Sequence, residues 1–166
     1  EDTQDEYWHE ALRGLREFSF RLGGSLVSAD LIAASAEDLG RKVKQNREIC
    51  GQVFPQYLDA YDCLATDLAL IARNPCSKLL DSFAEIARSL GSRTNIAILV
   101  CGRPLVPWTE SGISGRLRHT NVSVLVPWEV RGSECYDTMF VVGPTHWYQR
   151  WPFVFTAPRA PHVFRL

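Results

Sequence analysis

The chain has 166 residues, of which 46% are apolar and 22% charged, and its 18 basic and 19 acidic side chains leave a formal net charge of −1. This composition describes an ordinary soluble globular protein. The longest strongly apolar run, residues 96–101, is far shorter than the roughly 20 residues that cross a bilayer, and the N-terminus lacks the form of a signal peptide. A membrane span is therefore excluded.

The cysteines indicate a reducing environment. They are five in number, lie at least 13 positions apart and form no Cys-x-x-Cys pair: Cys50, Cys63, Cys76, Cys101 and Cys135. This pattern predicts free thiols in an intracellular, cytoplasmic protein with no structural metal site, and we expect no cofactor. Because the chain begins at Glu1 rather than at methionine, we expect a processed form or a fragment of a longer protein, whose remainder would be a partner.

Charge is distributed unevenly along the chain. Residues 1–100 carry 11 basic and 15 acidic side chains, whereas residues 101–166 carry seven basic and four acidic ones. All seven basic residues of the second part are arginines, whose planar guanidinium suits bidentate recognition of phosphate or carboxylate groups. Arginine outnumbers lysine by 15 to 3 over the whole chain, so codon usage is an equal explanation of this bias.

Four helices are predicted in the first 91 residues. The first begins with the capping box Thr3-Gln4-Asp5-Glu6 and stops at Gly23-Gly24, and the second runs from about residue 28 to 49. The third starts at Pro55 and ends at Asn74, and the fourth has Asn74 as its N-cap and Gly91 as its closing residue. We interpret the basic cluster of the second helix, Arg41, Lys42, Lys44 and Arg47, as a solvated face.

Four short apolar runs follow and predict strands: residues 96–100, 122–126, 139–142 and 153–155. They do not alternate between apolar and polar residues, which is typical of parallel strands buried on both faces. The predicted fold class is therefore α/β, with N-terminal helices packed with a small, mainly parallel four-stranded sheet. We expect a helical bundle or arm over residues 1–73 and a small α/β unit over residues 74–166. If the N-terminal helices cover the sheet, these form one continuous domain, 1–166.

The residues that follow each predicted strand are the candidate site, since ligands of open α/β sheets bind beyond the carboxyl ends of the strands. Tryptophans and arginines dominate there, and such side chains can stack bases and hold phosphates. The predicted binding residues are Arg103, Trp108, Arg116, Trp128, Arg131, His146, Trp147, Arg150, Trp151 and Arg159. The alternative is structural: the tryptophans close the end of the sheet and the arginines pair with Glu110, Glu129 and Glu134.

An enzyme is the second hypothesis, acting on a phosphorylated or nucleotide-like substrate. Cys101 would be its nucleophile, His146 its base, and Asp137 or Glu129 the group that orients the base. The chain lacks the phosphate-binding, dinucleotide-binding, serine-hydrolase and zinc-protease motifs, and a cysteine at the end of a strand is more often an apolar filler. We therefore favour a non-catalytic protein.

The order of a helix from Leu79 to Leu90, a polar turn and a strand from Ile96 to Val100 resembles the start of the second RecA-like half of a helicase motor. The paired arginine signature of such motors is missing, so the resemblance implies only an association with nucleic-acid machinery. The first hypothesis is thus a binding or assembly module of a larger intracellular system, in which the Trp- and Arg-rich loops contact a protein partner or nucleic acid.

Overall fold

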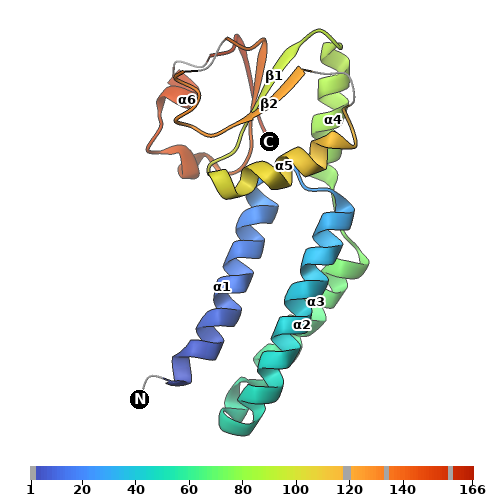
Figure 1. Cartoon of the computed structure of the whole chain (residues 1–166), viewed down its shortest axis with the longest axis vertical. Helices are drawn as coiled ribbons and strands as arrows, with labels where there is room; N and C mark the ends of the chain where they lie inside the picture. The colour runs from blue at the N-terminus through green and yellow to red at the C-terminus, as the bar shows by residue number, and fades with distance from the viewer. Residues whose placement is uncertain (1–2, 118–120, 133–134, 157–158) are drawn as a thin grey trace. The chain divides into compact units, whose positions relative to one another are not determined.

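The computed structural model describes residues 3–117, 121–132, 135–156 and 159–166 of the chain. The chain divides into two compact units. The helical unit comprises Glu1–Phe20 and Ala29–Cys76, and the sheet unit comprises Arg21–Ser28 and Ser77–Leu166. Figure 1 shows the order of the elements along the chain.

The helical unit contains α1 (Thr3–Gly24), α2 (Ala29–Val53) and α3 (Leu58–Arg73), with the 3-10 turn η1 (Pro55–Tyr57) before α3. The last turn of α1 belongs to the sheet unit. Helix α1 ends at Gly24, where Gly23-Gly24 predict its end, whereas α2 extends four residues beyond its predicted end. Pro55 starts the 3-10 turn rather than α3 itself. Val43, Tyr61 and Leu68 are almost completely buried in the core of this unit.

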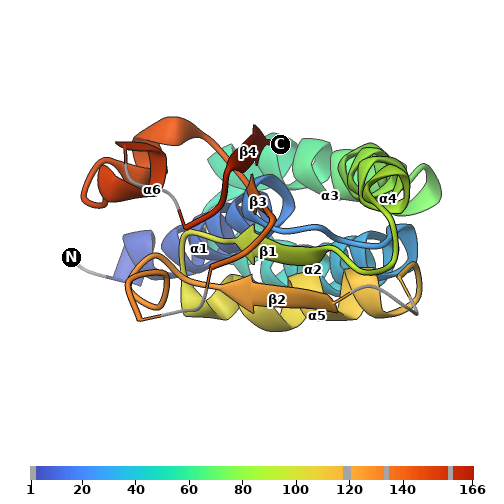
Figure 2. The ribbon, with the colours of Figure 1, turned by 90° about the horizontal axis from the view of Figure 1, so that it is seen from above.

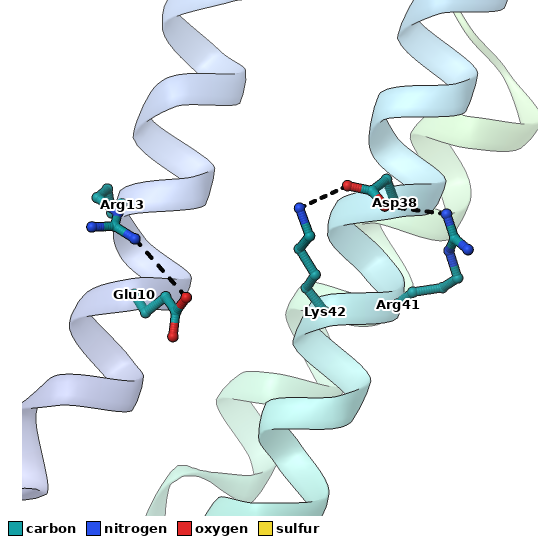
Figure 3. Close-up of polar contacts among 5 residues, drawn as sticks. All are labelled: Glu10, Arg13, Asp38, Arg41 and Lys42. Atoms are coloured by element: carbon teal, nitrogen blue, oxygen red, sulfur yellow. Dashed lines mark hydrogen bonds and ion pairs between the residues drawn. The ribbon is translucent and has the colours of Figure 1, made fainter.

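Ion pairs run along the exposed sides of these helices. The Asp38 carboxylate pairs with Arg41 at 3.1 Å and with Lys42 at 2.8 Å, and Glu10 pairs in the same way with Arg13 at 3.9 Å (Figure 3). The hydrogen bond from Lys42 holds the pKa of Asp38 below its ordinary value. These pairs join neighbours one helical turn apart, as expected of a solvated helix face.

The sheet unit contains α4 (Lys78–Leu90), α5 (Val106–Ser114), α6 (Phe153–Thr156) and the 3-10 turns η2 (Arg103–Leu105) and η3 (Thr145–Tyr148). The predicted N-cap of α4 is wrong, because Ser77 and not Asn74 occupies that position. Asn74 is instead the C-cap of α3, where its backbone N–H donates to the Leu70 carbonyl at 3.0 Å. Gly91 closes α4 as predicted, with a φ of +90° that favours glycine.

The strands β1 (Asn95–Leu99), β2 (Asn121–Leu125), β3 (Thr138–Val141) and β4 (His162–Arg165) form one sheet in the order β2-β1-β3-β4. All three pairings are parallel, with Ile98 of β1 opposite Val124 of β2 and Phe140 of β3. This confirms the predicted α/β fold with a small parallel sheet and N-terminal helices. Figure 2 shows β2 and β4 at the two edges of the sheet.

The predicted fourth strand is wrong. Residues 153–155 lie in the short helix α6, and the fourth strand follows at His162–Arg165. Pro152 starts the helix, since its carbonyl oxygen accepts hydrogen bonds from the N–H groups of Phe155 and Thr156. The true strand gives no continuous apolar signal, because β4 is an edge strand whose four residues are all exposed.

Both faces of the sheet are covered by elements of the sheet unit. On one face, Phe83 of α4 packs edge-on against Phe140 with ring centroids 4.9 Å apart, and α5 runs beside β2 (Figure 2). On the other face, Val130, Tyr148, Val154 and Ala160 pack against the side chains of four residues in β1 and β3, namely Ala97, Leu99, Met139 and Val141. The segment after β2 and the short helices thus supply the cover that such a sheet requires.

Candidate functional site

The carboxyl ends of β1 and β3 form the topological switch point of the sheet. The chain leaves β1 toward β2 on one side and leaves β3 toward β4 on the other, and open α/β sheets bind ligands at such a point. In this chain the Trp147 ring, and not a ligand, occupies the switch point. A Cβ placed on Gly143 would lie 3.1 Å from the Trp147 ring and 3.2 Å from the Gly23 carbonyl oxygen. Gly143 has a φ of +99°, so glycine is required here for its backbone as well as for space.

Tyr148 also closes this point, and Trp147 packs against the core cluster that contains it. Its hydroxyl lies 2.7 Å from the Val142 carbonyl oxygen and 3.1 Å from the Leu99 carbonyl oxygen, which joins the ends of β3 and β1. Burial raises the pKa of Tyr148, so the hydroxyl stays neutral and acts as a hydrogen-bond donor. The switch point is therefore packed with protein groups.

Cys101 lies two residues after the end of β1, beside this tyrosine. It is half-buried, and burial raises the pKa of its thiol to about 11. A nucleophilic cysteine needs a lowered pKa, because the thiolate is the reactive form. Cys101 therefore has the environment of a packing residue rather than that of a nucleophile.

The other members of the alternative catalytic set do not join Cys101. The Asp137 carboxylate accepts a hydrogen bond from the Asn95 backbone N–H at 2.7 Å, at the amino end of β1, whereas Cys101 follows the carboxyl end. His146 is exposed and contacts Trp147, with ring centroids 6.1 Å apart. Glu129 accepts from the Val126 backbone N–H at 3.1 Å and so shapes the turn after β2.

Four of the predicted binding residues come together beyond β2, with Phe153 of α6 among them. We call Trp128, Arg131, Trp151, Phe153 and Arg159 the aromatic–arginine surface. The rings of Trp128 and Trp151 lie 6.1 Å apart at an angle of 51°, and the Arg131 guanidinium lies 4.3 Å from the centre of the Phe153 ring. The Arg159 guanidinium donates a hydrogen bond to the Arg131 carbonyl oxygen at 3.1 Å, so the two arginines lie side by side.

Two features distinguish this surface from a packed end of the sheet. Trp128 is 48% exposed, although large apolar side chains are mostly buried elsewhere in the sheet unit. In the part of the chain that the structure describes, Arg131 and Arg159 pair with no carboxylate, and their contacts are those to Phe153 and to the Arg131 backbone. Exposed indole and guanidinium groups side by side can stack a planar ring and hold an anion.

The remaining predicted binding residues lie elsewhere or have other contacts. Arg103 pairs with Glu129 at 3.3 Å, as the structural alternative predicts for arginines of this region. Trp108 packs under the Arg21 guanidinium at 4.9 Å. The others are Arg116, which pairs with Asp81 at 2.9 Å, Trp147 at the switch point, and Arg150 and His146 on exposed turns. Glu110 pairs with none of these arginines among the described ion pairs, and Glu134 is outside the described residues.

Sequence reasoning missed Phe153, because the apolar run at residues 153–155 was assigned to a buried strand. Its place beside Arg131 depends on α6. The proline at 152, directly before the run, is the signal that favours a helix start over a strand.

The division into units sharpens the charge asymmetry. The sheet unit holds 11 basic and six acidic side chains, a net charge of +5, and the helical unit holds seven basic and 13 acidic ones, a net charge of −6. A cut at residue 100 places Lys78, Arg88 and Arg93 with the acidic part and hides this contrast. A positive field over one unit attracts anionic partners.

Within the described ranges, no cluster of three or more His, Cys, Asp or Glu side chains could hold a metal ion, and no helix is both long and apolar enough to cross a membrane. All five cysteines lie in described segments and are free. Comparison with models of protein families, with curated proteins and with solved structures finds no match for the chain.

Proposed function

We propose that the chain is a non-catalytic binding module of a larger intracellular system, and that its aromatic–arginine surface binds single-stranded nucleic acid. The observation that carries the proposal is the exposed Trp128, whose ring lies 6.1 Å from that of Trp151, beside two arginines that no described carboxylate neutralises. The charge of +5 on the sheet unit supports an anionic partner over a neutral one.

Single strands fit this surface better than a duplex does. A base of a duplex is stacked on both faces, whereas an unpaired base can place one face on an indole ring. Stacking on an aromatic side chain contributes about 1–3 kcal/mol per base and tolerates any sequence. Arg131 and Arg159 would hold the adjacent phosphates by charge-assisted hydrogen bonds.

Fluorescence anisotropy with a labelled 20-nucleotide single strand tests the proposal. We expect micromolar binding that weakens at least tenfold between about 50 and 200 mM salt, since released counterions drive phosphate contacts. Trp128→Ala removes the ring on which one base would stack. We expect this variant to bind the strand about tenfold more weakly, which corresponds to about 1.4 kcal/mol. A duplex of the same sequence should bind more weakly.

Arg131→Ala and Arg93→Ala form a matched pair, because each removes one positive charge from the sheet unit. Arg93 lies in the turn before β1, at the amino end of the sheet, and Arg131 contacts Phe153. We expect Arg131→Ala to weaken binding several-fold more than Arg93→Ala does. Equal losses would mean that binding follows total charge and not this surface. No binding by the folded protein would exclude nucleic acid and leave a protein partner for the same surface.

A further inference from the structure

The strand β2 has a free edge. The Leu125 carbonyl oxygen accepts a hydrogen bond from the Val100 N–H of the chain after β1 at 3.0 Å. In a parallel pair, alternate residues of one strand bond to the same neighbour, so Asn121, Ser123 and Leu125 face β1. The N–H and C=O groups of Val122 and Val124 therefore point away from the sheet. Among the turn, loop and side-chain hydrogen bonds of the described residues, none uses these four groups.

The two edges of the sheet differ in how they are protected against pairing. The strand β4 carries Arg165, and a charged side chain on an edge strand discourages the addition of another strand. The strand β2 has the sequence Asn-Val-Ser-Val-Leu and carries no charge. Its β-branched residues favour an extended partner. Of the two edges, β2 is thus the one suited to strand addition.

A groove lies beside this edge, between β2 and α5. It has a volume of about 470 Å³, and its apolar lining consists of Ile113 and Leu117 together with Val122 and Val124. Volumes of roughly 300–1,000 Å³ are typical of ligand pockets. When a peptide adds to a sheet edge, its alternate side chains point to one face of the sheet. A side chain of an added strand would therefore enter this groove.

The groove also carries one acidic group. Glu110 of α5 lines it, is exposed, and pairs with no basic side chain among the described residues. The nearby Arg116 is already held by Asp81 at 2.9 Å. A lysine or arginine of the added strand would complement the Glu110 carboxylate.

We propose that the β2 edge and the α5 groove bind an extended peptide segment of a partner protein. The backbone of the segment pairs with Val122 and Val124, an apolar side chain enters the groove, and a lysine or arginine lies beside Glu110. The site shares no residue with the aromatic–arginine surface, so it stands whether or not nucleic acid binds there. It would give the module a protein partner in addition to an anionic ligand.

Selection from a random peptide library displayed on phage, with the full chain immobilised, tests this inference. We expect enriched peptides to contain β-branched or apolar residues at alternate positions and a lysine or arginine among them. A synthetic fluorescein-labelled copy of the most enriched peptide then serves as the probe for anisotropy. If no peptide is enriched, or if the enriched peptides lack the basic residue, the proposal is wrong.

Two proline variants provide a matched control. Val124→Pro removes an N–H that points to the open side of β2, and Val163→Pro removes an N–H that points to the open side of β4. On β4, the Leu166 N–H donates to the Val141 carbonyl oxygen, so alternate residues face β3 and Val163 faces outward. Proline is tolerated where a strand N–H faces outward, so both variants should fold with an unchanged far-UV circular dichroism spectrum. We expect Val124→Pro to weaken peptide binding at least tenfold and Val163→Pro to leave it unchanged.

Charge reversal at the groove gives a second, independent readout. In the same selection with the Glu110→Lys variant, the enriched peptides should contain acidic residues in place of basic ones. The reason is that the substitution reverses the charge of an exposed side chain and leaves the core unchanged. An unchanged preference would contradict the assigned role of Glu110. If sedimentation shows that the chain forms a dimer that Val124→Pro abolishes, then a second copy occupies the edge and the peptide proposal is overturned.

Discussion

Gly112 of α5 supports a close approach between the helix and the segment after α1, which makes Gly112→Ala a sharp test of the sheet unit. A Cβ at this position would lie 1.9 Å from the Leu26 carbonyl oxygen and 3.0 Å from its carbonyl carbon. The contact must open from 1.9 Å to at least 3.0 Å, and backbone atoms have to move to achieve this. Leu26 is fully buried, so this movement disturbs packed core.

The expected cost follows from two contributions. Overpacking of a well-packed core costs about 1–3 kcal/mol. The movement also weakens the hydrogen bond from the Leu26 N–H to the Thr109 hydroxyl, at 3.4 Å, and such a bond contributes about 0.5–1.5 kcal/mol. We therefore expect Gly112→Ala to lower the free energy of unfolding of the sheet unit by about 2–4 kcal/mol.

Gly115→Ala is the matched control. Gly115 closes the same helix with a φ of −80°, and a Cβ there meets no atom within 4 Å. Alanine at such a position is neutral or stabilises by about 0.4–1 kcal/mol. Urea titration followed by tryptophan fluorescence is the assay, because four of the five tryptophans lie in the sheet unit. Equal stability of the two variants would refute the packing of the Leu26 segment against α5.

Three further predictions concern single side chains. Tyr148→Phe removes the hydroxyl beside the Val142 carbonyl and should cost about 1–3 kcal/mol in the same urea titration; an unchanged midpoint would contradict the closure of the switch point. Cys101, with its raised pKa of about 11, should react with iodoacetamide at pH 7.5 at least tenfold more slowly than the exposed Cys63, as peptide mass mapping would show. Comparable rates would contradict its burial. Arg47 lowers the pKa of Asp62, so this pair stabilises the fold above the ordinary aspartate pKa and loses its effect as the pH falls through the lowered value. The stability difference between the wild type and Asp62→Asn should shrink from pH 6 to pH 3, and a constant difference in urea titrations would exclude the pair as its source.

The sequence predicts well those elements that end at a glycine or that form a buried apolar run. Gly23-Gly24 ends α1 and Gly91 ends α4, because these residues either stop a helix or adopt a φ that other residues avoid. Buried strands such as β1 and β3 give continuous apolar runs. The edge strand β4 gives no such run, since its residues are exposed, and the apolar run before it belongs to α6. The continuous apolar runs that predict strands therefore reflect burial rather than strand propensity.

The candidate site depended on strand order, which a sequence does not contain. Sequence reasoning places tryptophans and arginines after the strands, and the parallel sheet does bring Trp128, Trp151 and Arg131 to one end. It could not separate them from Trp147, which fills the switch point, or from Trp108, which packs under Arg21. These roles follow from contacts between residues far apart in the chain. The function of the surface stays a proposal.

Photo-crosslinking tests the central claim most directly. A single-stranded oligonucleotide that carries 5-bromodeoxyuridine is irradiated with the full chain, and the crosslinked peptides are mapped by mass spectrometry. Aromatic rings stacked on the bases are the expected sites, so crosslinks should fall on Trp128 or Trp151 and disappear at high salt, where phosphate contacts weaken. Crosslinks confined to the helical unit, or to Trp108, would contradict the aromatic–arginine surface as the nucleic-acid site.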